Sequence, residues 1–167
     1  NLLVDNYARE HTYLRISVTD RCNLRCVYCM PAEGVPLKKR EEILTLEEIY
    51  RVAKVFVGLG IDKIRITGGE PLVRKGLDGL IKRLGALAGV KTLAMTTNAV
   101  LLADQVRQLH QSGLTALNIS LDSLQPKRFE AITLRDDHAK VMAGITAALS
   151  EKLETVKLNC VVIAGVN

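Results

Sequence analysis

The residues of this 167-residue chain best suited to chemistry are three cysteines on one short segment. Cys22, Cys26 and Cys29 are spaced C-x3-C-x2-C. Three thiolates at this spacing can each hold one iron of a 4Fe–4S cube and leave the last iron without a protein ligand. An iron with an open position can bind a small molecule. The segment therefore predicts a cluster that takes part in chemistry.

Two other uses of these thiols have to be weighed. A structural zinc ion takes four protein ligands, and the nearest candidate for the fourth, His11, lies before the first predicted strand and not on the loop. A disulfide within the loop would leave an odd thiol, and the chain shows no secretory signal. Zinc ranks second, and a disulfide lower.

Short β-branched runs alternate with longer amphipathic runs, which is typical of repeated βα units around a parallel sheet. We expect strands at residues 14–18, 63–67, 91–96, 115–121 and 156–162. We expect helices at residues 45–59, 76–87, 103–112 and 139–152, with a short extra one at 126–132. Thr45 and Glu48 form a capping box at the start of the first helix, and Gly113 favours a stop after the third.

The predicted strands alternate in polarity, whereas parallel strands that are covered on both faces read as continuous apolar runs. The apolar positions, which would pack under the helices, are Leu14, Ile16, Ile64, Ile66, Leu93, Met95, Leu117, Ile119, Val156 and Leu158. The polar positions are Arg15, Ser17, Lys63, Arg65, Thr67, Thr96, Asn118, Ser120, Lys157 and Asn159. Four of these are cations, and no Asp or Glu of the strands shares their face. Since unpaired buried charge is costly, a barrel lined by this face is expected to hold an anionic ligand.

The cysteine segment resembles the cluster motif of the radical S-adenosylmethionine superfamily, in which the amino and carboxylate groups of S-adenosylmethionine chelate the open iron. Gly68-Gly69-Glu70-Pro71 is similar to the GGE motif of that superfamily, where backbone groups and the carboxylate meet the methionine ammonium. Alone, such a tetrapeptide is more often a turn. Its place after the second predicted strand, downstream of the cysteines, favours the motif.

A closer resemblance, to the GTP 3′,8-cyclase family of molybdenum cofactor biosynthesis, rests on residues 14–23, 29–31, 63–72, 96–98 and 118–124. It covers nearly the whole chain but only about the first half of that family's length. The fold class that it implies is α/β, an incomplete (βα) TIM-like barrel of parallel strands with outer helices. The implied domain, residues 1–167, is a radical SAM core that forms the N-terminal part of a longer protein. The start at Asn1 and the end after an apolar run also suggest a piece of a longer chain.

The resemblance implies a role for each matching residue. Cys22, Cys26 and Cys29 bind the cluster. Tyr28, Gly69 and Ser120 contact S-adenosylmethionine, and Gly68 and Glu70 complete the GGE motif. Arg15, Arg65, Thr96 and Lys157 match positions that contact GTP, and Lys63 is added because it shares their face. The four GTP positions belong to the polar face found from alternation alone, and Arg and Lys are the expected phosphate partners.

The chemistry implied is a radical cyclisation. The reduced cluster passes one electron to S-adenosylmethionine, the resulting 5′-deoxyadenosyl radical removes the 3′ hydrogen of GTP, and 3′,8-cyclo-7,8-dihydro-GTP forms. A downstream cyclic pyranopterin monophosphate synthase uses that product. The family's second 4Fe–4S cluster is bound in the other half, so we do not expect this chain alone to complete turnover. A radical enzyme for another anionic substrate, and a non-catalytic metal-stabilised binding module, are the alternatives.

The composition indicates an ordinary globular domain, with 48% hydrophobic and 25% charged residues and a net charge of +5. The basic run at 38–40 is followed at once by Glu41 and Glu42, so no broad nucleic-acid stripe is evident. Apolar runs are too short to span a membrane. We therefore expect a cytoplasmic protein with neither nucleic acid nor membrane as a partner.

Two positions depart from the family pattern or fall outside it. Ala99 stands where the family usually has Gly after a Thr-Thr-Asn run, which matters if the backbone there needs a positive φ. Cys160 matches no family ligand, and its apolar position predicts a small buried hydrophobe. For His11, His110 and His138 we expect ordinary surface or helix roles.

Overall fold

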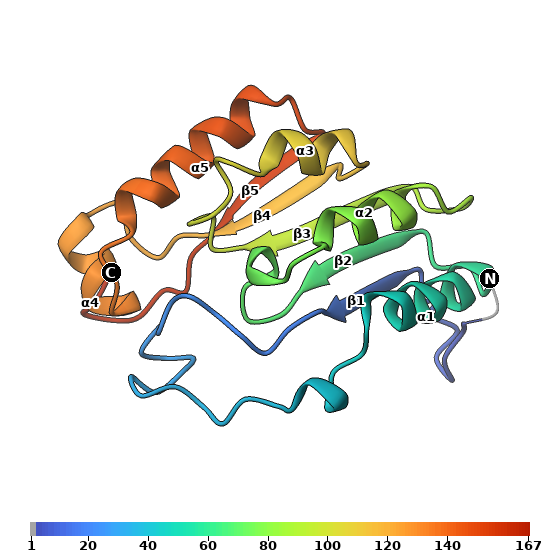
Figure 1. Cartoon of the computed structure of the whole chain (residues 1–167), viewed down its shortest axis with the longest axis horizontal. Coiled ribbons are helices and arrows are strands. Elements are labelled where there is room, and N and C mark those ends of the chain that lie inside the picture. Colours follow the sequence, from blue (N-terminus) through green and yellow to red (C-terminus); the bar gives the residue numbers. More distant parts are fainter. Residues whose placement is uncertain (1–2) are drawn as a thin grey trace.

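The structure is a computed structural model that describes residues 3–167. Residues 1 and 2, with which the predicted domain begins, lie outside the described residues. Five parallel strands form one sheet in the order β1-β2-β3-β4-β5 (Figure 1). Their bounds are Tyr13–Ser17 (β1), Lys63–Thr67 (β2), Thr92–Thr97 (β3), Ala116–Ser120 (β4) and Thr155–Asn159 (β5).

All five predicted strands are confirmed, and β2 has the predicted bounds. The largest difference is at β5, which was expected to continue to residue 162 but ends at Asn159. The reason is local, because the Val161 N–H donates to the Asp122 carboxylate (2.8 Å) and the chain leaves the ladder there. The apolar run in the sequence is thus longer than the strand that it forms.

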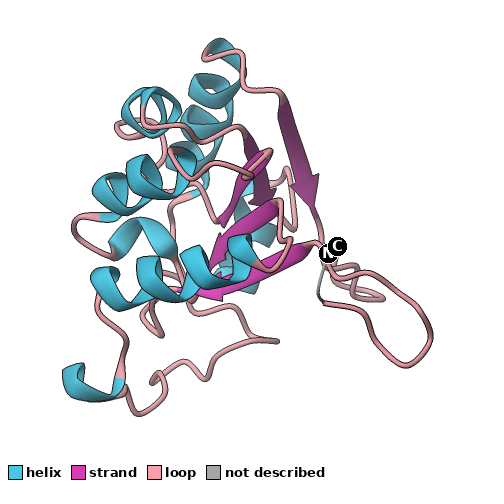
Figure 2. Cartoon of the chain, turned by 90° about the vertical axis from the view of Figure 1, so that its right-hand side faces the viewer, coloured by secondary structure: helices cyan, strands magenta, loops and turns pink. Residues whose placement is uncertain are grey.

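The predicted helices also form. Their bounds are Leu46–Gly58 (α1), Leu77–Gly85 (α2), Val106–Gln111 (α3), Pro126–Thr133 (α4) and His138–Ser150 (α5), and two short 3-10 helices lie at Arg40–Glu42 (η1) and Pro71–Val73 (η2). The order of helix contacts is α1 to α2 to α3 to α5. Figure 2 shows this layer on one side of the strands. None of the helices among residues 3–167 is long and apolar enough to cross a membrane.

The start of α1 and the end of α3 follow the expected local rules. The Glu48 N–H donates to Thr45 Oγ1 (3.2 Å), and the Thr45 N–H donates to Glu48 Oε2 (2.7 Å). This is the predicted capping box, which satisfies two amides that the first turn leaves without partners. Gly113, with φ of +106°, follows the end of α3 as expected.

The helix-facing side of the sheet is the apolar face predicted from alternation. Its central side chains are fully buried or nearly so, and they are Ile64, Ile66, Leu93, Met95, Leu117 and Ile119. They join one core cluster with helix residues such as Ile49, Ile81 and Leu84. On the two edge strands of this sheet burial is less complete, since Leu14, Ile16 and Val156 are partly buried and Leu158 is 54% exposed. The core therefore lies between the sheet and the helix layer.

The prediction for Cys160 is wrong. Its side chain is exposed, and the thiol donates weakly to the Asp122 carbonyl (3.6 Å). It lies just beyond β5, at the edge where Leu158 is also uncovered. Alternation assigns a residue to a face but does not say whether another element covers that face.

The histidines have the ordinary roles expected of them. His138 opens α5 and packs edge-on against Phe129, with ring centres 5.5 Å apart. His110 lies on α3 beside Glu151, and His11 lies beside Asp5 near the N-terminus. All three lie outside the segment that carries the clustered cysteines.

Ala99 has a φ of +63°, so the turn after β3 does need the left-handed conformation. Its methyl group is fully buried, and a Cβ built on Gly144 of α5 would lie 3.2 Å from it. Ala99→Gly should gain about 1 kcal/mol of stability by relieving backbone strain. It should lose about 1 kcal/mol because one buried methyl group is removed. We expect a variant that is neutral, or stabilised by at most about 1 kcal/mol, in chemical denaturation.

Ala53→Gly in α1 is the matched control, since Ala53 is equally buried but helical. This control should lose stability by about 1 kcal/mol or more. An Ala99→Gly variant that loses as much as the control would show that the methyl group outweighs the strain.

Candidate functional site

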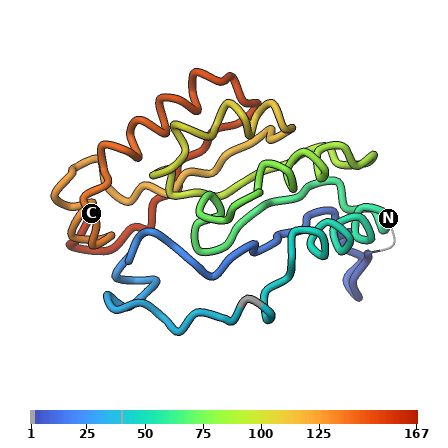
Figure 3. Tube along the Cα trace, viewed as in Figure 1, coloured from blue at the N-terminus to red at the C-terminus, as the bar shows by residue number. Residues whose placement is uncertain are grey.

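The cysteine segment follows β1 at the carboxyl-terminal edge of the sheet, where βα barrels carry their reactive loops. Cys22 and Cys26 are partly buried, and Cys29 is exposed. In Figure 3 the blue segment that follows β1 lies at the left of the picture, on the same side as the red end of the chain. The turns after β2, β3 and β4 end at this edge as well, because all strands are parallel.

The backbone of the cysteine loop is fastened to α4. The Arg25 N–H donates to the Thr133 carbonyl and the Val27 N–H to the Ile132 carbonyl, each at 2.9 Å. These are last-turn carbonyls of α4, which have no partners within the helix. Within the loop, the Cys29 N–H donates to the Cys26 carbonyl (2.8 Å). These bonds hold the cysteine loop against the end of α4.

The two glycines of the Gly-Gly-Glu-Pro run allow the β2 turn to touch the cysteine loop. The Gly69 N–H donates to the Thr19 carbonyl at 2.8 Å. A Cβ on Gly69 would lie 2.3 Å from the Arg21 oxygen, and one on Gly68 would lie 2.6 Å from the Thr19 oxygen. Real Cβ atoms do not approach backbone oxygens so closely. Close backbone approach thus explains both glycines, and their contact with S-adenosylmethionine stays a prediction.

Glu70 is buried, at 1% exposed, and its carboxylate bridges two strand ends. One oxygen accepts from the Leu72 N–H (3.0 Å) and the Thr97 hydroxyl (2.8 Å), and the other accepts from the Asn98 N–H (2.7 Å). Burial raises the pKa of Glu70 above its usual value. The hydrogen bonds of this carboxylate go to the protein itself, so its predicted contact with the methionine ammonium stays a prediction.

Asn98 continues this connection to the cysteine loop. Its Nδ2 donates to Asn23 Oδ1 (2.8 Å) and lies 3.8 Å from the Cys22 sulfur. The end of β3 is therefore joined to the first cysteine. Sequence reasoning included Asn98 in a resembling run but gave it no role, because its partner Cys22 is 76 positions away.

Tyr28 and Asp122 join the loop to the end of β4. The Tyr28 hydroxyl donates to Asp122 Oδ2 at 2.6 Å, while Asp122 Oδ1 accepts from the Val161 N–H. Burial and the Asp122 carboxylate raise the pKa of Tyr28, which keeps the phenol protonated. Ser120 lies partly buried at the end of β4. Whether Tyr28 and Ser120 contact S-adenosylmethionine stays a prediction, and Asp122 is a residue that sequence reasoning missed.

The thiols lie in a partly desolvated environment. Burial raises the pKa of Cys22 and raises that of Cys26 to about 11. Because a metal binds the thiolate, iron has to displace these protons. Among residues 3–167, no three Cys, His, Asp or Glu side chains are grouped closely enough to hold one metal ion. Whether the three thiols bind a cluster or a single zinc stays a prediction.

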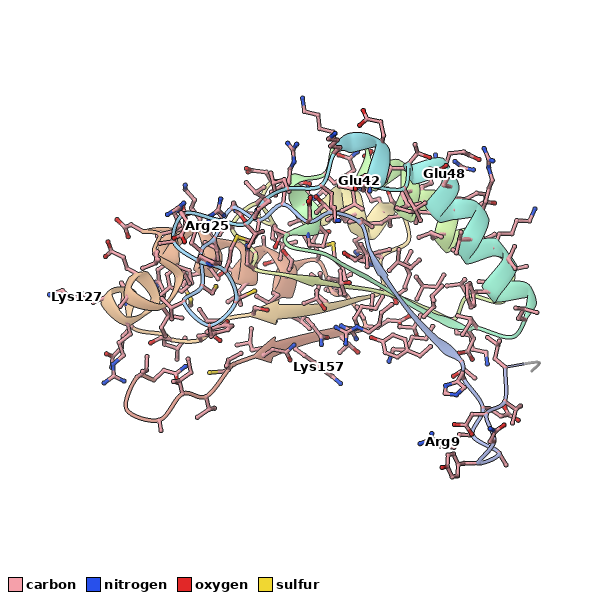
Figure 4. All side chains as sticks on the ribbon, turned by 90° about the horizontal axis from the view of Figure 1, so that it is seen from below. Arg9, Arg25, Glu42, Glu48, Lys127 and Lys157 are labelled. Atoms are coloured by element: carbon pink, nitrogen blue, oxygen red, sulfur yellow. The ribbon has the colours of Figure 1, made fainter. Side chains whose placement is uncertain are left out.

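The polar face of the sheet gathers the predicted cations. Arg15 lies opposite Arg65 in the ladder, and Arg65 Nη1 donates to Thr96 Oγ1 (3.4 Å). Lys157 lies opposite Asn118, which lies opposite Thr96. Figure 4 shows Lys157 projecting from the sheet on the side away from α1. The structure thus brings the predicted GTP residues onto one face.

Tyr13 is a member of this face that sequence reasoning missed. Its hydroxyl accepts from Arg65 Nε (2.5 Å), and Lys63 Nζ lies 5.3 Å from the centre of its ring. The ring therefore supports both cations without neutralising them. Among the described residues, neither these two cations nor Arg15 and Lys157 form an ion pair with a carboxylate.

Comparison with known proteins gives a consistent picture. The Radical SAM superfamily matches residues 16–167. The chain is 53% identical, over its whole length, to a GTP 3′,8-cyclase of Peptoclostridium acidaminophilum, of which it covers 51%. It is 51% identical over 165 residues to molybdenum cofactor biosynthesis protein 1 of Mus musculus, covering 99% of this chain and 26% of that protein. The chain thus spans about half the length of the cyclase and about a quarter of the length of the mouse protein.

Solved structures give the same fold. Methylornithine synthase (PylB) aligns with a TM-score of 0.70 at 14% identity, covering 93% of this chain and 45% of that one. An anSMEcpe structure with bound AdoMet aligns with a TM-score of 0.68 at 18% identity, covering 89% and 41%. With five parallel strands and outer helices, the predicted fold class, an incomplete (βα) TIM-like barrel, is confirmed.

Glu70→Gln tests the role of the buried carboxylate. A glutamine has one acceptor oxygen, so its NH2 group must face either the Asn98 N–H or the Leu72 N–H and Thr97 hydroxyl. We expect a loss of unfolding free energy of about 1–3 kcal/mol, measured by chemical denaturation. Glu130→Gln on the exposed side of α4 is the matched control and should be neutral. Equal stability of the two variants would contradict this role.

Proposed function

Because this chain belongs to the radical SAM superfamily, we propose that it is the cluster-binding and cofactor-binding half of a GTP 3′,8-cyclase. The proposal is carried by one juxtaposition. A loop of three cysteines lies at the carboxyl-terminal edge of a sheet whose polar face presents four cations, and none of the four pairs with a carboxylate among the described residues. The 53% identity to a GTP 3′,8-cyclase over the whole chain supports the choice of reaction.

In the proposed site, Cys22, Cys26 and Cys29 hold a 4Fe–4S cluster. The donor set fits that group, since it offers three free thiols on one loop that is hydrogen-bonded to the end of α4. When bound, the cluster and S-adenosylmethionine supply one-electron radical chemistry. The second cluster expected in this family would come from the half of the protein outside this chain.

The residues proposed for S-adenosylmethionine line the same edge. Gly68 and Gly69 let the β2 turn pack against Thr19 and Arg21, just before Cys22, so their backbone would be available to a cofactor bound there. Glu70 holds that turn to the end of β3. Tyr28 and Ser120 would add contacts from the loop and from β4. The structure around these residues supports a cofactor held between the cluster and the sheet.

Arg15, Lys63, Arg65, Thr96 and Lys157 are proposed to bind GTP. Arg65 is held by Tyr13 and Thr96, so its guanidinium is oriented before any ligand binds. An oriented guanidinium loses less freedom on binding a phosphate. Three strands contribute cations, β1, β2 and β5, which suits a triphosphate that spans the sheet. A radical enzyme for another polyanionic substrate would use the same face.

Other features of the complete protein stay predictions. These are its cytoplasmic location, the absence of nucleic-acid and membrane partners, and a downstream cyclic pyranopterin monophosphate synthase. The extent of the core domain over residues 1–167 is also a prediction. A non-catalytic metal-stabilised module remains the competing class. Metal analysis separates the two classes. About four irons per cluster-bearing chain indicate the enzyme, and one zinc indicates the module.

Serine substitution tests the cluster ligands. Cys22→Ser, Cys26→Ser and Cys29→Ser should each abolish the iron–sulfur absorbance assigned to this loop in anaerobically reconstituted protein. Cys160→Ser is the matched control, because Cys160 lies exposed beyond β5 and should leave the absorbance intact. A full cluster that survives any one of the three substitutions would remove that cysteine from the site.

Arg65→Ala tests the cation face. Loss of one charge-assisted contact to phosphate costs about 1.5–3 kcal/mol, so GTP affinity of the full-length enzyme should fall by roughly ten- to a hundredfold in calorimetry. Cleavage of S-adenosylmethionine without substrate should survive at matched iron content. Lys54→Ala on the outer surface of α1 is the control, and it should leave GTP affinity unchanged. Unchanged GTP affinity with lost cofactor cleavage in Arg65→Ala would move this residue to the cofactor site.

A further inference from the structure

The orientation of the Asn98 amide is set by its neighbours. Its Oδ1 accepts from the Val100 N–H (3.1 Å), so the NH2 group must face the other way. An NH2 group has two hydrogens to donate. One is used by Asn23 Oδ1 at 2.8 Å, and the Cys22 sulfur lies 3.8 Å from the same nitrogen. The second hydrogen is therefore available to that sulfur.

The amide is also held firmly. Asn98 is 8% exposed, and its backbone N–H is bound by the buried Glu70 carboxylate at 2.7 Å. The next residue, Ala99, has a positive φ, and its N–H donates to Thr97 Oγ1 (3.0 Å). Backbone and side chain are thus fixed from both sides. The amide dipole keeps its position and cannot swing away from the cysteine loop.

We propose that Asn98 is a positioning residue that donates an N–H hydrogen bond to the Cys22 thiolate and thereby raises the reduction potential of the cluster. The inference rests on the proposed cluster and goes beyond it. A thiol is a weak acceptor, but a metal-bound thiolate carries negative charge and accepts more strongly. The contact is therefore expected to tighten when iron binds.

The direction of the effect follows from charge. Reduction adds an electron to the cluster, and part of that charge resides on the sulfurs. A fixed N–H dipole beside a sulfur stabilises the reduced form more than the oxidised form. Hydrogen bonds to the sulfurs are one of the protein's main controls over cluster potential. Removing this donor should make the cluster harder to reduce.

Two variants separate the donor from its structural surroundings. Asn98→Asp keeps the acceptor oxygen for the Val100 N–H but replaces the donor with an anionic acceptor beside Cys22. Asn98→Ala removes both. Gln111→Glu, on the exposed end of α3, adds the same negative charge far from the loop and is the control.

The measurement is an EPR-monitored redox titration of reconstituted protein at matched iron content, without S-adenosylmethionine. We expect a lower midpoint potential in Asn98→Ala, a still lower one in Asn98→Asp, and no change in Gln111→Glu. Wild-type potentials in both Asn98 variants would overturn the inference while leaving the cluster proposal intact. A wild-type protein that binds no iron would overturn the proposed function instead.

A second readout needs no substitution and applies even if the variants fail to hold iron. Wild-type protein reconstituted in heavy water should show a shifted iron–thiolate stretching band in resonance Raman spectra, because deuterium alters a hydrogen bond to sulfur. Identical bands in light and heavy water would show that no N–H donates to a cluster thiolate, and would overturn the inference.

Discussion

The Glu70 carboxylate is buried where β2 and β3 end, and the arrangement of the site depends on it. It binds three neutral donors and forms no ion pair among the described residues, so hydrogen bonds alone offset the cost of its burial. These bonds fix the β2 turn against the end of β3. The β2 turn also packs against the start of the cysteine loop, because Gly69 lies against the Arg21 carbonyl. Asn98, which follows β3, makes a second connection to that loop through its hydrogen bond to Asn23.

The opposite side of the sheet follows a second constraint. Four cations share the polar face, and no carboxylate pairs with them in the part of the chain that the structure describes. Unpaired charge cannot form a dry core, so this face must stay hydrated or hold an anion. The helix-facing side stabilises the fold through the hydrophobic effect, since its aliphatic side chains are buried in one cluster. One sheet thus separates a face that stabilises the fold from a face that can bind a ligand.

Much of this architecture could be predicted from the sequence because strands have a period of two. Lys63 to Thr67 alternates so regularly that both the strand and its two faces were predicted correctly. The exposure of Cys160 could not be predicted, because alternation does not report what covers a strand end. The roles of Tyr13, Asn98 and Asp122 were missed for another reason. Their partners Arg65, Cys22 and Tyr28 lie 52, 76 and 94 positions away, and only the folded chain brings them together.

The central claim is that the cysteine loop holds a cluster with one iron left open to S-adenosylmethionine. Mössbauer spectroscopy of reconstituted protein, recorded with and without S-adenosylmethionine, tests it most directly. We predict that a single iron of the cluster bound by this loop changes its isomer shift when S-adenosylmethionine is added, while its other irons keep theirs. Spectra that do not change on addition, or a protein that holds zinc and no iron, would contradict the account.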